Sequence, residues 1–127
     1  MDLYFLSLED VLEVHADQIN RYGGRQGIRD QGLLISAIAQ PHALFGGNYL
    51  HPTIHDKAAA YLFHLSQNHP FVDGNKRVAV VSALMFLAMN DYSFDYDEKS
   101  LEKMTFSVAK GTLKKTEIAY FLSKELG

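Results

Sequence analysis

Apolar residues recur at intervals of three and four along most of the chain, which is the period of an amphipathic α-helix. The first such stripe follows Ser7, which can cap a helix together with Asp10. It can end at the glycine pair Gly23 and Gly24. The side chains expected on the inner face of this helix are Leu8, Val11, Leu12, His15 and Ile19.

The same period predicts two more helices in the first half of the chain. One lies between Asp30 and Pro41, and the side chains that it would bury are Leu33, Leu34 and Ile38. The next begins near Ile54, and the residues of its stripe are Ala58, Tyr61, Leu62 and Leu65. Four residues further on, the stripe reaches His69, which this helix is expected to present from its buried face. Because Pro70 disfavours the α conformation at residue 69, the helix is expected to end there.

The second half of the chain is also helical in pattern. From Asn75 to Met89 the residues are apolar nearly all round, which predicts that other helices surround this segment. Further helices are expected at 101–109, ending at Gly111, and at 116–126, capped by Thr116. Residues 41–53 lack helical period and predict a loop or short hairpin flap, whereas Tyr92–Tyr96 alternates like a strand. We therefore expect an all-α fold: one domain over residues 1–127, a compact bundle of about six helices with a short flap.

Length and composition exclude several classes of protein. A chain of 127 residues is too small for an ordinary protein kinase and lacks its Gly-rich strand turn and His-Arg-Asp loop. A net charge of -3 without a long basic stripe argues against direct binding to nucleic acid. The absence of cysteine excludes thiolate catalysis and, with no secretion signal, predicts a cytoplasmic protein. The longest apolar run, Val78–Met89, is shorter than the roughly 20 residues that cross a bilayer, so no membrane contact is expected.

The most informative stretch of the sequence is His-Pro-Phe-Val-Asp-Gly-Asn-Lys-Arg, at residues 69–77. A helix that begins at Asn75 leaves backbone N–H groups unpaired at its start, where the positive end of the helix dipole lies. Such an end binds anions, and a glycine at position 74 would let a phosphate approach the backbone. The residues expected to bind phosphate are Gly74, Asn75, Lys76 and Arg77.

Three other side chains complete this stretch. Asp73 would repel a bare phosphate but can share a Mg2+ with one, because Mg2+ prefers one or two carboxylates together with phosphate oxygens and waters. A neutral imidazole at His69 can accept the proton of an attacking hydroxyl, a role that typically contributes about 10²- to 10⁴-fold. Phe71 is expected to anchor the loop in the core. An ordinary interhelix turn would need none of His69, Asn75 or Arg77, so we expect a site for a magnesium nucleotide beside a general base.

This stretch resembles the signature of the Fic/Doc family, His-x-Phe-x-(Asp/Glu)-Gly-Asn-x-Arg, through His69, Phe71, Asp73, Gly74, Asn75 and Arg77. The branch that transfers AMP usually has glycine where this chain has Lys76, and often arginine where it has Val80. These departures, with Arg21-Tyr22-Gly23-Gly24 after the first helix, make the chain similar to the Doc branch, the "death on curing" toxins. The resemblance implies the Fic/Doc fold and transfer of the γ-phosphate of ATP to a Ser or Thr hydroxyl of a protein, with His69 as the base.

The resemblance also implies partners for this chain. ATP and Mg2+ are the expected cofactors, and the implied target is elongation factor Tu, whose modification would inhibit translation. Toxins of this branch are paired with an antitoxin, and the chain lacks the family's (Ser/Thr)-x-x-x-Glu-(Gly/Asn) inhibitory pattern. Inhibition is therefore expected in trans, from an antitoxin segment that folds into a groove near the site. In the family a flap pairs with the backbone of the target, and the matching residues here are Gly46, Gly47, Asn48 and Tyr49.

Other interpretations stay open from the sequence. An AMP transferase of the same family, or a catalytically silent binding module, would share the stretch at 69–77. A metal site is a further alternative, built from His51, His55 and His64. His55-Asp56 is also the dipeptide of HD phosphohydrolases, but their flanking ligand pattern is missing, and a helix-start Asp beside a surface His is the simpler interpretation. Arg21 and Arg25 could reach a phosphate or lie as plain surface charges, and residues 46–49 could be a mobile connector.

Overall fold

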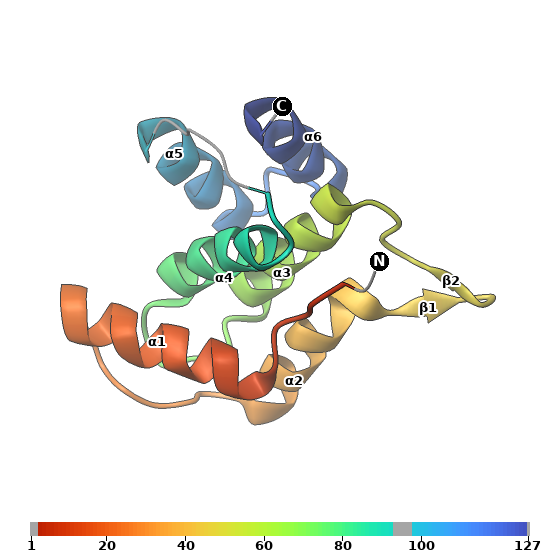
Figure 1. Ribbon diagram of the computed structural model, residues 1–127. Coiled ribbons are helices and arrows are strands. Elements are labelled where there is room, and N and C mark those ends of the chain that lie inside the picture. The colour runs from red at the N-terminus through yellow and green to blue at the C-terminus, as the bar shows by residue number, and fades with distance from the viewer. Residues whose placement is uncertain (1–2, 93–97, 127) are drawn as a thin grey trace.

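The part of the chain that the computed structural model describes, residues 3–92 and 98–126, folds into six α-helices and one two-stranded hairpin (Figure 1). In order, the elements are α1 (Leu8–Tyr22), α2 (Gln31–Ala39), the 3-10 helix η1 (Gln40–His42), β1 (Leu44–Phe45), β2 (Asn48–Tyr49), α3 (Ile54–Asn68), α4 (Asn75–Met89), α5 (Glu98–Ala109) and α6 (Lys115–Leu126). The predicted all-α fold with a short flap is confirmed. Within the same residues, every helix is too short or too polar to span a bilayer.

Capping side chains set the starts of the first three α-helices. Ser7 and Asp10 form the predicted capping box at α1, each side chain accepting the backbone N–H of the other. The Asp30 carboxylate accepts an N–H of the first turn of α2, as its position had suggested. A second capping box, between Thr53 and Asp56, starts α3. Asp56 of the His-Asp dipeptide therefore caps the start of α3.

The centre of the bundle is the pair α3 and α4 (Figure 1). α3 packs against α2, α4, α5 and α6, while α1 and α5 lie on α4. Tyr61 of α3 is fully buried, and its hydroxyl accepts the N–H of Leu6 at 2.8 Å. Burial raises the pKa of Tyr61 to about 12. The loop of residues 69–74 connects these two central helices, so both of its ends are firmly anchored.

Two predictions of burial are wrong. Leu33 is exposed, because the inner face of α2 is formed by Leu34, Ala37 and Ile38. The helix α4 begins and ends where the sequence predicted, but its outer side is exposed at Met85, Ala88 and Met89. Other helices therefore cover α4 on part of its circumference and leave an apolar strip in solvent.

The last two helices also differ in detail from the prediction. α5 begins at Glu98, before the expected residue 101, and the chain leaves it through Gly111, whose φ of 79° suits a glycine. α6 begins at Lys115, so Thr116 lies within its first turn and does not cap it. The Glu117 carboxylate accepts the N–H of Lys114 at this end. The predicted strand Tyr92–Tyr96 lies outside the described residues except for Tyr92.

The segment 41–53 contains the predicted hairpin. β1 and β2 pair antiparallel, with Leu44 opposite Tyr49. The turn between them is made by Gly46 and Gly47, whose φ values of 59° and 82° match the two left-handed positions of a tight hairpin turn. The hairpin's own apolar side chains are exposed to solvent, including Phe45, which is 79% exposed.

A buried lysine anchors the hairpin to the start of α3. Lys57 is 1% exposed, and its Nζ donates to the carbonyls of His51 at 2.7 Å and Pro52 at 3.0 Å. The same ammonium lies 4.1 Å from the centre of the Tyr49 ring. Burial lowers the pKa of Lys57. These contacts satisfy the ammonium and fix the chain between β2 and α3.

Candidate functional site

His69 lies just beyond α3 in a left-handed conformation, with φ 50° and ψ 53°. The helix ends at Asn68, as predicted, but the left-handed turn places the His69 side chain in solvent and not on the buried face. A residue with a side chain in this region costs of the order of 1–3 kcal/mol. The guanidinium of Arg29 stabilises the turn, because its Nε donates to the His69 carbonyl at 2.6 Å and its Nη2 to the Asn68 carbonyl at 2.9 Å.

The loop is also held through its backbone by residues 27–30. Ile28 and Phe71 form an isolated antiparallel bridge. Around it, Pro70 accepts the N–H groups of Arg29 and Asp30, at 2.7 and 3.0 Å, and the Val72 N–H donates to the Gly27 carbonyl. Backbone hydrogen bonds thus join two segments that are at least 40 positions apart in sequence, and this contact positions the loop that carries His69.

Below the loop, Phe71 is fully buried, as expected, and stacks on His15 of α1. The two ring centres are 3.9 Å apart and the planes differ by 7°. His15 Nε2 also lies 2.9 Å from the Asp73 carbonyl, which accepts a hydrogen bond from it. The sequence predicted His15 as a core residue, and the structure adds a polar contact with the candidate site. Neither His15 nor Arg29 carries a local signal for these roles.

The side chain of Asn75 faces the inside of the loop. Its Oδ1 accepts the Phe71 N–H at 2.9 Å, and its Nδ2 donates to the Phe71 carbonyl at 2.9 Å and lies 2.6 Å from His69 Nδ1. The sequence predicted Asn75 as a phosphate-binding residue, but in the structure its side-chain amide is engaged within the loop. The amide holds the imidazole instead, so the contribution that Asn75 can make to phosphate binding comes from its backbone N–H.

Gly74 forms the N-cap of α4 with φ 80° and ψ 13°, and no side chain caps this helix end. A Cβ at this position would lie 3.1 Å from Ile19 Cδ1. The glycine is therefore required by its left-handed backbone and by packing on α1, and not simply by space for a phosphate. The first N–H groups of α4 have no partner within the helix, which leaves a positive end suited to an anion.

Two cations flank this helix end. Lys76 is exposed, and its Nζ lies 4.7 Å from the centre of the Phe106 ring. The Arg77 Nη2 donates to the Gly23 carbonyl at 2.9 Å, and the guanidinium lies over the Tyr22 ring. Arg77 thus ties the start of α4 to the end of α1 while keeping other N–H groups for a ligand.

Asp73 is exposed between His69 and the helix end. Its Oδ2 accepts the Arg25 N–H at 3.2 Å, and its Oδ1 accepts the N–H of Gly74 at 2.9 Å. Among the described residues, no cluster of three or more His, Cys, Asp or Glu could hold a metal ion. One carboxylate with free lone pairs still fits Mg2+, because the remaining ligands of this ion are commonly phosphate oxygens and waters.

The remaining sequence candidates lie outside this arrangement. Arg21 pairs with Asp17 on the surface of α1, with Nε to Oδ1 at 2.9 Å. The described residues contain no metal cluster of histidines, and His64 instead lies 2.9 Å from the Lys115 ammonium. His55 is half-buried and packs edge-on against Tyr92, so it is not a surface histidine.

The flap lies at the opposite end of α3 from His69. Gly46, Gly47, Asn48 and Tyr49 lie in the hairpin at the N-terminal end of α3, whereas His69 follows its C-terminal end (Figure 1). A helix of 15 residues spans about 22 Å. A peptide paired with the hairpin would therefore not place its hydroxyl over the imidazole in this conformation, which contradicts the predicted role of the flap.

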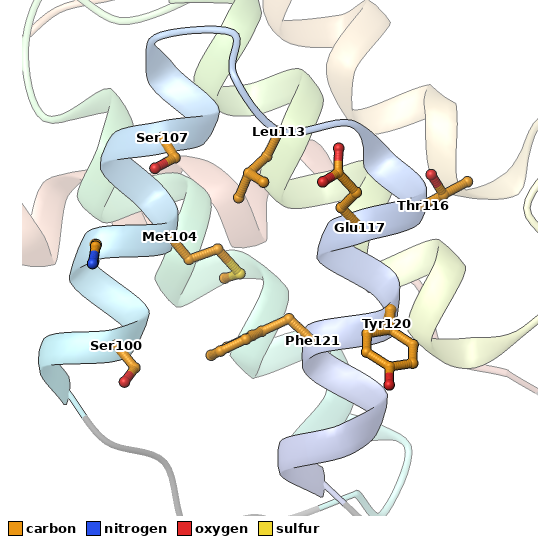
Figure 2. A pocket seen from close by; sticks show the side chains of 9 residues that line it. Ser100, Met104, Ser107, Leu113, Thr116, Glu117, Tyr120 and Phe121 are labelled. Carbon is orange, nitrogen blue, oxygen red and sulfur yellow. The ribbon is translucent and has the colours of Figure 1, made fainter.

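Of two cavities lined by described residues, one adjoins the loop. The larger, about 610 Å³, lies between α5 and α6, where Met104, Leu113 and Phe121 form apolar walls (Figure 2). No residue of the 69–77 stretch lines it. The other, about 540 Å³, is a groove between α1, α4 and α5 whose lining includes both Lys76 and Arg77. The groove, and not the larger cavity, is continuous with the candidate site.

Residues 5–87 match the model of the Fic/DOC family, which covers α1 to α3 and most of α4. Over 107 residues the chain is 40% identical to "Toxin Doc" of Mycolicibacterium smegmatis, which corresponds to 83% of this chain and 80% of that protein. Over 122 residues it is 30% identical to "Protein kinase doc" of Escherichia phage P1, or 96% of this chain and 95% of that protein.

Proposed function

This chain belongs to the Fic/DOC family, in its Doc toxin branch, and from this premise we propose that it is a toxin that transfers the γ-phosphate of ATP to a Ser or Thr hydroxyl of a protein. The observation that carries the proposal is the geometry of one loop, in which the exposed His69 imidazole, the Asp73 carboxylate and the uncapped start of α4 are held together. The names of the two relatives, a toxin and a protein kinase, support it.

The nucleotide phosphates would lie at the start of α4. Backbone N–H groups there would donate to phosphate oxygens, with the Lys76 ammonium and the unused N–H groups of Arg77 beside them. Asp73 would hold Mg2+ together with phosphate oxygens. When bound, Mg2+ would neutralise part of the negative charge of the phosphates. The role of the protein is then to fix the triphosphate relative to the imidazole.

The transfer requires the protein to accept one proton. The oxygen of the target hydroxyl forms a bond to the γ-phosphorus, and the hydroxyl proton passes to the imidazole of His69. The bond between the γ-phosphorus and the oxygen that bridges it to the β-phosphate breaks, and ADP leaves. Lys76, where glycine is usual in the AMP-transferring branch, adds charge and bulk at the helix end and favours this orientation of the triphosphate.

An antitoxin would act at the groove between α1, α4 and α5. Its floor includes the apolar side chains of Val80, Val81 and Leu84, and its rim includes Lys76 and Arg77. A disordered segment that folds into this groove would cover both cations without entering the loop. Inhibition would then follow from loss of the phosphate-binding end of α4.

Elongation factor Tu is the target that the family resemblance suggests. The test is incubation of the purified chain with ATP, Mg2+ and purified elongation factor Tu, followed by mass spectrometry of both proteins. We expect the mass of one phosphoryl group on the factor and lost translation when the treated factor is added to an extract depleted of it. Addition of an adenylyl mass would favour the AMP transferase, and an unmodified factor beside a modified protein in whole extract would reject this target.

A further inference from the structure

The orientation of the Asn75 amide is fixed by two backbone groups. The bridge between Ile28 and Phe71 takes its hydrogen bonds from the flanking residues, so the N–H and carbonyl of Phe71 remain for Asn75. The N–H of Phe71 donates to Oδ1, and the carbonyl of Phe71 accepts from Nδ2. Exchanging the two amide atoms would place donor against donor and acceptor against acceptor, so the nitrogen faces His69.

This orientation decides which ring nitrogen of His69 carries the proton. Asn75 Nδ2 lies 2.6 Å from His69 Nδ1 and has a second N–H to donate, because its first one is used by Phe71. Nδ1 must accept that N–H through its lone pair. A neutral imidazole has one protonated and one unprotonated nitrogen, so its proton is on Nε2.

We propose that Asn75 holds the resting His69 in the Nε2–H tautomer, so that the nitrogen turned away from Asn75 is a hydrogen-bond donor until the ring leaves the amide. The consequence of this tautomer for catalysis rests on the proposed function, in which His69 is the general base. In the resting form the lone pair that a general base needs is occupied by Asn75, and a proton added at Nδ1 would face the N–H of the amide. Asn75 is thus a positioning residue, and the imidazole must break this contact, by turning about its Cβ–Cγ bond, before it can take the hydroxyl proton.

Nitrogen NMR of the full chain tests the tautomer directly. Long-range proton–nitrogen correlation spectra of the 15N-labelled protein distinguish the two neutral tautomers by the pattern of cross-peaks, and the His69 signals are assigned by their loss in His69→Gln. The spectra are recorded without ATP or target, at a pH where a further increase leaves the pattern unchanged. We expect the Nε2–H pattern. An Nδ1–H pattern in the wild-type protein would overturn the proposal.

A matched pair of variants tests whether Asn75 is the cause. In Asn75→Asp a carboxylate oxygen can accept Nδ1–H, so the proton should move to Nδ1 and the pattern should reverse. Asn68→Asp places the same charge next to His69, where the wild-type amide donates to the Leu33 carbonyl, and should keep the Nε2–H pattern. An Asn75→Asp variant that folds with an unchanged pattern would reject Asn75 as the cause. Since no transfer is measured, failure of this inference and failure of the proposed kinase activity are distinguishable.

Discussion

The imidazole of His69 is exposed, while the backbone on both sides of it is tied down by Arg29 and by the bridge to residue 28. We expect His69→Gln to lower the rate of phosphate transfer by at least about 10²-fold, because a general base contributes 10²- to 10⁴-fold. Nucleotide binding and the free energy of unfolding should stay close to wild type, since the side chain buries little surface. Initial rates and calorimetric ATP binding measure both effects. Transfer within a few-fold of wild type would rule out His69 as the base.

Asp73 offers a second test at the scale of one residue. We expect Asp73→Ala and Asp73→Asn to remove the part of ATP affinity that depends on Mg2+, because we propose this carboxylate as the metal ligand of the loop. The asparagine variant is the structural control, since its amide oxygen can still accept the Arg25 N–H that Asp73 accepts in the wild type. Titration calorimetry with and without Mg2+ gives the result. If Mg2+ raised the ATP affinity of both variants as much as that of the wild type, Asp73 would be excluded from metal binding.

At the scale of elements, Arg29 joins the loop before α2 to the end of α3. Arg29→Met removes two charge-assisted hydrogen bonds to the carbonyls of Asn68 and His69. Because these groups are partly solvated, we expect a loss of unfolding free energy of about 1–2 kcal/mol, with a larger loss in transfer than in ATP binding as His69 is no longer held.

The matched control for this prediction is Arg21→Met, which breaks an exposed pair with Asp17 on the surface of α1. Its effect on stability and on transfer should be small. Denaturant titrations and initial rates compare the two variants. Equal behaviour of Arg29→Met and Arg21→Met would show that the contact with α3 does not position the loop.

Several helix ends were predictable from the sequence because their causes are local, whereas the starts of α5 and α6 differ from the prediction. The cap at Ser7, the end of α3 before His69 and the bounds of α4 all follow from residues within one turn of each boundary. The contacts that hold the site are not local: Arg29 acts on a carbonyl 40 positions away, and neither partner shows a pattern of its own. The separation of the flap from His69 follows from the length of α3, which a motif comparison does not consider.

At the scale of the whole molecule, three buried or half-buried histidines couple stability to pH. Burial, with the charge of Lys115 as the next cause, lowers the pKa of His64 to about 4, and burial also lowers the pKa of His51 and His55. In the unfolded chain these groups titrate near ~6.5. Between these values the unfolded state binds protons that the native state does not, so the free energy of unfolding falls as pH drops from about 6.5 towards 4.

For His64 the loss can reach about 3 kcal/mol, because each pH unit of the interval contributes about 1.4 kcal/mol. Urea unfolding at a series of pH values measures it. In His64→Gln the amide oxygen can still accept a hydrogen bond from Lys115. The free energy of unfolding of this variant should fall less steeply with decreasing pH than that of the wild type over this interval. An unchanged slope in the variant, or wild-type stability that is constant down to pH 4.5, would contradict a neutral His64 in the folded protein.

The phosphorus that the target hydroxyl attacks distinguishes the proposed kinase from the AMP transferase of the same family. Cell extract is incubated with the purified, antitoxin-free chain and Mg2+, in parallel with γ-phosphate-labelled and α-phosphate-labelled ATP, and with His69→Gln as the blank. We expect protein-bound label from the γ-labelled ATP above the blank, and none from the α-labelled ATP, because Lys76 stands where the AMP-transferring branch has glycine. Protein-bound label from the α position, or from neither, would contradict phosphate transfer by this chain.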